Sequence, residues 1–183
     1  RNIATIAGNI CNASPVADTA VVLMAADAKL IIASENNKSR KINIKDFYLG
    51  YKKIDIKNTE VVEAIEIPID ENLLFSFEKT SKRKSVDIST VNSAISIKIE
   101  NKIIKKINIA FGGIAATPIA LTETKNFLTE KNITEEIINQ SAILAVQSVN
   151  PISDMRGSEE YRKLLIKNHI IKHFHKLFSS YEK

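Results

Sequence analysis

The sequence predicts an α+β fold in two parts that meet near residue 70. Between residues 29 and 111, short segments alternate apolar and polar residues, which is typical of strands. The last third of the chain carries apolar residues at three- and four-residue steps, which is typical of helices with one buried face. We therefore expect a first part of mixed structure, followed by a small antiparallel sheet covered by helices. The 183 residues suffice for one large domain or two small ones with their own cores.

The charge pattern argues against a nucleic-acid partner. The 26 lysines and arginines exceed the 21 acidic residues, but the net charge of +5 is spread along the chain. A nucleic-acid binder usually gathers its positive charge on one face. The densest basic runs here are short and lie beside predicted turns, so we interpret them as solvated surface.

The remaining composition points to a reducing compartment. A single cysteine, Cys11, excludes an internal disulfide and a cysteine-ligated iron–sulfur cluster in this chain. No apolar run approaches the roughly 20 residues that span a bilayer, and no signal peptide is visible. We expect a cytoplasmic protein with no membrane association. The start at Arg1 suggests a fragment or a processed chain.

Residues 4–18 are small and turn-forming, and they run directly into an apolar segment. Ser14 followed by Pro15 predicts a helix start, with serine as the cap and proline at the first helical position, and a helix through about residue 27. Gly8 permits close approach to the main chain. Such a segment suits a phosphate or a nucleotide sugar, although a plain loop-to-helix turn would give the same pattern. Its polar side chains are Thr5, Asn9, Asn12, Ser14 and Asp18.

The rest of the first part reads as short strands. Residues 29–33 and 41–44 predict a hairpin with a turn at residues 35–38. Residues 46–51 form an aromatic loop, which we expect to pack onto the sheet through Phe47, Tyr48 and Tyr51. Residues 60–67 predict another strand, ended by Pro68 because proline cannot donate to a ladder.

The second part begins with a predicted strand at residues 73–80, which includes Lys79 as an edge-strand lysine. Residues 93–99 and 103–111 predict a hairpin with one apolar and one polar face, followed by a bend at Gly112 and Gly113. Three helices are then expected, at residues 121–129, residues 134–146, and from Ser158 to about residue 178. Thr134 and Ser158 are their predicted caps.

Residues 5–18 resemble the second FAD-contacting loop of the flavin domain in molybdenum hydroxylases, the xanthine dehydrogenase family. That family usually reads Gly-Gly-Asn-Ile, then Ala-Ser-Pro and an Asp; this chain has Ala7 in place of the first glycine. Further family segments follow in order from residue 46 to residue 162. They are Asp-Phe-x-x-Gly-Tyr at 46–51, Ile-x-Ile-Pro at 65–68, Arg and Asp-Ile-Ser within 83–89, Gly-Gly-x-Ala at 112–115, and Asp-x-Arg-Gly-Ser-x-x-Tyr-Arg at 154–162.

The resemblance implies an FAD site on this chain. It places Gly8 and Asn9 at the pyrophosphate, and Thr5 and Asp18 in polar contact with the phosphate–ribose region. Lys79 falls beside the flavin ring, where a cation stabilises negative charge on the reduced ring. Arg83 and Asp87 are expected to pair and hold their loop. The remaining implied contacts are Val61 and Val62 against the flavin ring, and Ala4 and Asn12 in the segment of residues 4–18. From the sequence alone, both valines are equally well explained as buried residues of a strand.

The resemblance also implies an assembly. Residues 1–70 would form the rear half of an FAD-binding domain, and residues 71–183 the C-terminal domain of the flavoprotein. Molybdopterin and two [2Fe–2S] clusters would lie on partner chains or domains, and electrons would pass through FAD to NAD or another acceptor. The N-terminal half of the FAD domain would be missing from this sequence and would be supplied either as a fused segment or as a separate chain. The alternative is a structural module of the same fold that serves in subunit assembly and does not bind flavin by itself.

Other catalytic patterns are weaker. His169 and His173 lie one helical turn apart and could share a zinc ion, but no third ligand has a suitable spacing. A Ser-His-Asp hydrolase would need a glycine-flanked nucleophile, which we do not find. The paired glutamates at 135–136 and 159–160 lie in predicted first helical turns, where the helix dipole accounts for them.

Overall fold

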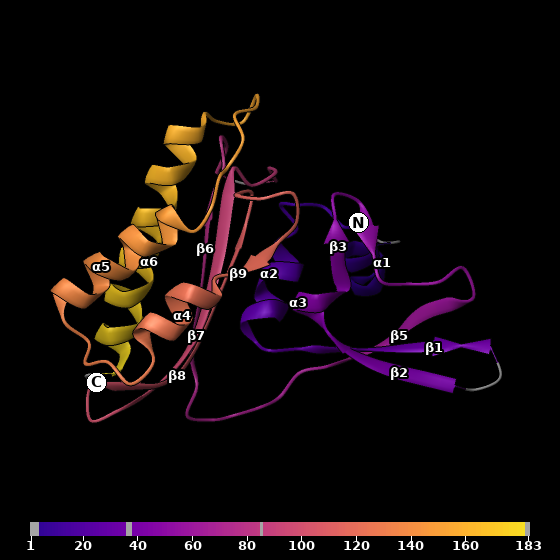
Figure 1. Ribbon diagram of the computed structural model, residues 1–183, viewed down its shortest axis with the longest axis horizontal. Helices are drawn as coiled ribbons and strands as arrows, with labels where there is room; N and C mark the ends of the chain where they lie inside the picture. Colours follow the sequence, from indigo (N-terminus) through magenta and orange to yellow (C-terminus); the bar gives the residue numbers. More distant parts are fainter. Residues whose placement is uncertain (1–3, 36–37, 85, 182–183) are drawn as a thin grey trace.

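The computed structural model describes residues 4–35, 38–84 and 86–181, and it contains two packed units (Figure 1). The first unit comprises α1 (Ile6–Cys11), α2 (Asp18–Ala25), β1 (Lys29–Ser34), β2 (Lys38–Asn43), α3 (Ile44–Phe47), β3 (Tyr48–Gly50), β4 (Lys53–Ile54) and β5 (Glu60–Glu66). The second comprises β6 (Leu74–Thr80), β7 (Val91–Glu100), β8 (Ile103–Gly112), β9 (Ile119–Ala120), α4 (Thr122–Leu128), α5 (Glu135–Gln147) and α6 (Glu159–Tyr181). The predicted α+β class is confirmed.

The first unit contains a three-stranded antiparallel sheet in the order β2-β1-β5. The predicted hairpin is confirmed as β1 and β2, and residues 36–37 of its expected turn lie outside the described residues. The expected aromatic loop is instead α3 followed by the small β3–β4 pair. Phe47 and Tyr48 are buried as expected, but Tyr51 is 63% exposed because it lies in the turn that joins β3 to β4.

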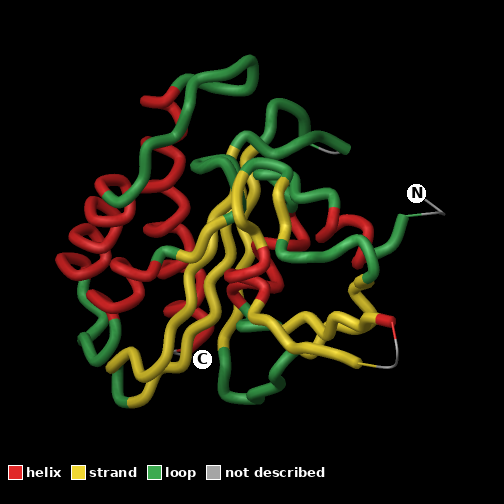
Figure 2. The backbone as a smooth tube through the Cα atoms, turned by 45° about the vertical axis from the view of Figure 1, so that its right-hand side comes forward, coloured by secondary structure: helices red, strands yellow, loops and turns green. Residues whose placement is uncertain are grey.

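The second unit is a four-stranded antiparallel sheet in the order β6-β7-β8-β9. The predicted hairpin is confirmed, with Ser93 opposite Phe111 and Ile97 opposite Ile107. Figures 1 and 2 show α4, α5 and α6 covering one face of this sheet, while α2 of the first unit lies on the other. The residues of β7 that were predicted to form the polar face of this hairpin are buried against α2: Ala94 packs into the core of the first unit, and the Ser96 hydroxyl donates to the Ala25 carbonyl at 2.6 Å.

Two apolar cores follow from this layering. The core of the first unit includes Ile10, Val21, Leu30, Ile32 and Phe47 together with Ala94 and Ala110 of the second sheet. The core between the second sheet and its helices includes Ile95, Ile97, Ile107, Phe111, Leu165, Ile170 and Phe174. Small residues on β7 and β8 let α2 approach closely, which joins the two units.

The start of α2 differs from the prediction. Ser14 and Pro15 do not begin a helix; residues 14–17 form a turn in which the Ala17 amide donates to the Ser14 carbonyl at 3.1 Å, and α2 begins at Asp18. The Pro15 carbonyl accepts the Gly113 amide at 2.9 Å, so this segment is held against the bend after β8. The short helix α1, which the small residues of this segment did not predict, is capped by Thr5.

The three predicted C-terminal helices are confirmed. Thr134 caps α5 by accepting the Ile137 amide at 3.2 Å, and the Ser158 hydroxyl accepts the Tyr161 amide at 3.2 Å at the start of α6. Among the described residues, no helix combines the length and the apolar character needed to span a membrane.

His169 and His173 of α6 bond to hydroxyl groups of the sheet. The Ser93 hydroxyl lies 2.8 Å from His169 Nδ1 and 2.7 Å from His173 Nε2. Thr80 and Ser76 bond to the outer nitrogens of the two rings, each at 2.9 Å. Burial lowers the pKa of His169 to about 4 and that of His173 to about 3, so both rings are neutral at physiological pH.

Candidate functional site

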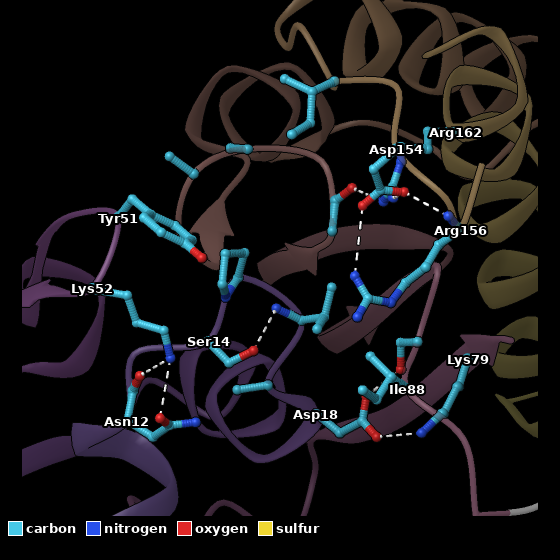
Figure 3. Close-up of a pocket in the computed structure, with 18 of the residues that line it drawn as sticks. Asn12, Ser14, Asp18, Tyr51, Lys52, Lys79, Ile88, Asp154, Arg156 and Arg162 are labelled. Atoms are coloured by element: carbon cyan, nitrogen blue, oxygen red, sulfur yellow. Dashed lines mark hydrogen bonds and ion pairs between the residues drawn. The ribbon is translucent and has the colours of Figure 1, made fainter. Parts of the chain in front are cut away.

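A cavity of about 930 Å³ lies between the two units (Figure 3). One wall is formed by residues 9–19 and the turn between β3 and β4. The other wall is formed by Lys79 of β6, residues 87–89, the bend after β8, the segment before α6 and Arg162 of α6. The lining residues are Asn9, Asn12, Ser14–Thr19, Tyr51, Lys52, Lys79, Asp87–Ser89, Gly113, Ala115, Ala116, Asn150, Ile152, Asp154, Arg156 and Arg162.

Asp18 and Lys79, which are 61 positions apart, form an ion pair in this cavity. Lys79 Nζ lies 2.7 Å from Asp18 Oδ2 (Figure 3). Asp18 Oδ1 accepts the Ser89 hydroxyl at 2.6 Å and also the amide group of Asn92. Burial raises the pKa of Asp18, but the hydrogen bonds from these three residues and the Lys79 charge outweigh burial and hold the pKa below its usual range. The Asp18 carboxylate therefore fixes a cation at the cavity surface.

The wall of the first unit is held by Lys52. Its backbone is in the left-handed region (φ 57°), and its ammonium donates to the carbonyl and to Oδ1 of Asn12 at 2.6 and 3.0 Å. Asn12 is the C-terminal cap of α1. A cation at this end of a helix can accept no bonds but can donate to the carbonyls that lack an intrahelical partner. This contact ties the β3–β4 turn to α1.

The amides predicted for the pyrophosphate are bonded within α1. The Gly8 amide donates to the Thr5 hydroxyl at 2.9 Å, and the Asn9 amide donates to the Thr5 carbonyl at 3.0 Å. A Cβ atom on Gly8 would lie 2.9 Å from that hydroxyl, so glycine permits the cap. Asn9 lines the cavity, but Ala4, Thr5 and Gly8 do not.

Val61 and Val62 lie away from the cavity on β5. Val61 is 63% exposed, whereas Val62 packs partly against the core of the first unit. Successive residues of a strand point to opposite faces, so only one of the two can face any common ligand. Of the nine residues predicted from sequence, the structure gathers Asn9, Asn12, Asp18 and Lys79 around the cavity.

The opposite wall is organised by Arg162, which is buried in the second unit. One terminal nitrogen of its guanidinium donates to the carbonyls of Thr90 and Gly113 at 2.6 and 2.5 Å, and the other lies 2.6 Å from Asp154 Oδ1. Gly113 has φ +81°, a conformation that favours glycine. Arg162 thereby joins α6, the bend after β8 and the turn at residues 154–157.

Asp154 and Arg156 form the rim of that wall. Burial raises the pKa of Asp154, but the Arg156 amide, the Arg162 guanidinium and the Gly157 amide together hold it below its usual range. Sequence reasoning identified these residues only as part of the 154–162 family segment and gave them no place in the site. The family segment itself could have pointed to these residues, because its charged side chains come directly before the capped start of a helix.

The predicted pair of Arg83 and Asp87 is confirmed at the edge of the cavity. The Arg83 amide donates to Asp87 Oδ2 at 2.9 Å, and its guanidinium lies 3.4 Å from Oδ1. This contact closes the loop that carries Ile88, whose apolar side chain lines the cavity. The cavity thus combines charged groups, amide groups and apolar side chains, so it can offer both polar donors and apolar contacts to a ligand.

Two family models match this chain. One is the FAD binding domain in molybdopterin dehydrogenase, over residues 1–70, and the other is the CO dehydrogenase flavoprotein C-terminal domain, over residues 76–177. The chain belongs to the molybdopterin dehydrogenase flavoprotein family. Together with the xanthine dehydrogenase relatives described next, these matches confirm the predicted resemblance to the xanthine dehydrogenase family.

Curated relatives of this flavoprotein chain come from plants, archaea and bacteria. Xanthine dehydrogenase 1 of Arabidopsis thaliana is 34% identical over 181 residues, covering 95% of this chain and 13% of the relative. The glyceraldehyde dehydrogenase medium chain of Sulfolobus acidocaldarius is 32% identical, covering 91% and 59%. The xanthine dehydrogenase FAD-binding subunit of Escherichia coli O157:H7 is 31% identical, covering 91% and 57%. This flavoprotein chain thus spans less than two thirds of each relative.

Solved structures share the fold. Quinoline 2-oxidoreductase from Pseudomonas putida 86 superposes with a TM-score of 0.87 at 26% identity, covering 98% of this chain and 62% of that one. A carbon monoxide dehydrogenase from Hydrogenophaga pseudoflava gives a TM-score of 0.91 at 24% identity, with the same coverage.

Proposed function

We propose that this chain binds FAD in the cavity between its two units and serves as the flavin component of a molybdenum-containing hydroxylase. The observation that carries the proposal is the cavity wall at residues 9–19, which lies within the segment that matches the FAD-binding model. The Asp18–Lys79 pair supports it, because it holds an ammonium group at the cavity surface, where the remaining N–H bonds can donate to a ligand.

The proposed division of labour follows from the described contacts. FAD, when bound, supplies the electron-transfer chemistry, and the protein supplies binding and electrostatics. Lys79 is held by Asp18, so it can present its charge without reorganising. Asn9 and Asn12 offer side-chain amides on the wall of the first unit. In this proposal Asp18 acts mainly by positioning Lys79.

The other predicted contacts need a rearrangement or a partner. Thr5 now accepts the Gly8 amide, so a phosphate would have to replace its hydroxyl before Gly8 could donate to a ligand. Ala4 adjoins this cap and would move with it. Val61 and Val62 lie outside the cavity and could meet the flavin ring only if the ligand extends over β5.

We further propose that an N-terminal half of the FAD domain, either fused or on a separate chain, completes the site, with the division of this chain near residue 70. Exposed apolar side chains on the first unit support a packing partner there; they are Ile6, Leu49, Val61, Ile67 and Ile69. We also propose that iron–sulfur and molybdopterin partners pass electrons to this chain. NAD or another acceptor would receive them, and the enzyme would be cytoplasmic. The alternative, a flavin-free assembly module, is not favoured, because the cavity wall at residues 9–19 lies within the segment that matches the FAD-binding model.

The flavin content of the purified enzyme that contains this chain tests the proposal. We expect about one FAD for each copy of the chain, measured as released flavin after denaturation. A colourless enzyme that stays without flavin after incubation with FAD would contradict the proposal and favour the assembly module.

A further inference from the structure

The strand β6 carries Lys79 one residue before its end and lies at the edge of the second sheet. In the part of the chain that the structure describes, β6 pairs with β7 alone, and Lys79 lies opposite Asn92. The last residues of an edge strand are held from one side only, so they are the ones that fray most easily. The place of the Lys79 ammonium at the cavity (Figure 3) therefore depends on what else holds the end of β6.

Every second residue of β6 from position 76 to position 80 faces α6 and forms a polar contact with it. The three contacts are Ser76 with His173 at 2.9 Å, Glu78 with Lys172 at 2.6 Å, and Thr80 with His169 at 2.9 Å. Lys79 lies on the opposite face of the strand, where Phe77 packs against the core of the first unit. The contact between Thr80 and His169 is the last of the three and the nearest to Lys79 along the chain.

The ring of His169 is fixed at both of its nitrogens. Its Nε2 lies 2.9 Å from the Thr80 hydroxyl of β6, and its Nδ1 lies 2.8 Å from the Ser93 hydroxyl of β7. The ring is buried, with its centroid 6.1 Å from that of Phe111. A neutral imidazole has one donor and one acceptor nitrogen, so the two hydroxyls satisfy both. His169 thereby ties the end of the edge strand β6 to the interior strand β7.

The opposite face of the sheet is tied at the same level. The two hydroxyls that His169 joins are adjacent in the chain to Lys79 and Asn92. Those two residues are partners in the strand register, and both bond to the Asp18 carboxylate of α2. A shift of the end of β6 relative to β7 would therefore change the separation of Lys79 and Asp18 directly.

We propose that His169 is a positioning residue for Lys79. By holding Thr80 against β7, it keeps the end of β6 in register and the Lys79 ammonium at the cavity surface. His169 does not line the cavity, so it acts through the strand and not on a ligand. This inference rests on the proposed function, because the position of Lys79 affects the flavin only if FAD occupies this cavity.

The test compares T80V with S76A in the assembled enzyme. Each substitution removes one hydroxyl that lies 2.9 Å from the outer nitrogen of a histidine ring, so each removes one hydrogen bond between β6 and α6. Valine keeps the branched shape of threonine and favours a strand. S76A is the matched control, because it leaves the end of β6 tied to His169. T80S keeps the hydroxyl and should restore wild-type behaviour.

We expect T80V to weaken FAD binding about three- to tenfold in a calorimetric titration of the flavin-stripped enzyme. The flavin reduction potential of T80V should become more negative, because the reduced ring loses part of the stabilisation by the cation. S76A and T80S should match wild type in both measurements. T80V should cause no further loss of FAD affinity in a K79M background, because its effect passes through Lys79.

Thermal melts give a readout that does not involve flavin. The coupling energy between Asp18 and Lys79, obtained from D18N, K79M and the double variant, should be smaller in a T80V background than in an S76A background. Equal coupling energies in the two backgrounds would show that Thr80 does not position Lys79 and would overturn the inference.

The flavin measurements can overturn it in three further ways. Equal FAD affinity and potential in T80V and wild type would refute the positioning role while leaving the proposed function intact. An S76A enzyme that loses as much affinity as T80V would assign the effect to general loosening of α6, and additive losses in T80V/K79M would exclude a route through Lys79. Absence of flavin from every variant, wild type included, would refute the proposed function and this inference with it.

Discussion

Replacing Asp18 by asparagine tests the anchor of the candidate site while keeping its shape. The carboxylate accepts hydrogen bonds from Lys79, Ser89 and Asn92, which come from three different parts of the second unit. Asparagine has one acceptor oxygen and no charge, so it cannot serve all three donors. The variant should therefore loosen the contact between α2 and the second sheet and release Lys79.

The contacts set the size of the effect. The side chains of Lys79 and Asp18 are 30% and 38% exposed, so solvent screening limits their pair to about 0.5–1 kcal/mol. The hydrogen bonds from Ser89 and Asn92 are better shielded from solvent. Asparagine can keep one of them, so the substitution loses about 1 kcal/mol from this pair of bonds. We expect D18N to lose about 2 kcal/mol of unfolding free energy, which lowers Tm by roughly 4–8 °C.

Thermal unfolding at neutral pH measures this loss, with D46N as the control at an exposed position of α3. A double-mutant cycle with K79M should return a coupling energy of about 0.5–1 kcal/mol.

The pKa of Asp18 is depressed in the folded state, so the stability that Asp18 contributes is present above about pH 4 and lost as pH falls through the lower folded pKa. FAD affinity of the assembled enzyme should fall about tenfold. Equal Tm values for D18N and wild type would refute the role given to Asp18 as an anchor.

The remaining predictions concern the second unit. His169 and His173 are neutral in the folded state, whereas in the unfolded chain they take up protons below about pH 6.5, so stability should fall by about 2 kcal/mol per histidine as pH drops to about 5. The H169Q/H173Q variant should flatten that dependence in thermal melts, and an unchanged slope would contradict it. G113A should lower the unfolding free energy by about 2 kcal/mol or more, since the residue has φ +81° and an added Cβ would collide with the Thr90 carbonyl. The control G50A has open space around its Cβ, and a denaturation midpoint equal for the two variants would rule out the strain argument.

Local patterns predicted much of the fold. Alternation predicted the β1–β2 and β7–β8 hairpins, and hydroxyl residues before acidic first turns predicted the starts of α5 and α6. These elements are determined by neighbouring residues, so a single sequence contains the information. The buried second face of β7 could not be predicted, because its small residues meet α2, which lies about 70 positions earlier in the chain.

The same limit applies to the site. The segment at residues 4–18 could be chosen from its composition and its resemblance, and Asp18 and Lys79 do meet. The start of α2 was wrong because the Pro15 carbonyl bonds to Gly113, a contact made only after the two units pack. Arg156 was missed for a similar reason: its turn reaches the cavity only because Arg162 ties α6 to the bend after β8.

Calorimetric titration of FAD into the flavin-stripped enzyme tests the central claim most directly, with wild type and D18N/K79M compared in the same assembly. We predict stoichiometric binding to wild type, affinity weakened at least about tenfold in the double variant, and much weaker binding to the isolated 183-residue chain. Equal affinity of wild type and D18N/K79M would place the flavin outside the cavity between the two units and contradict the account.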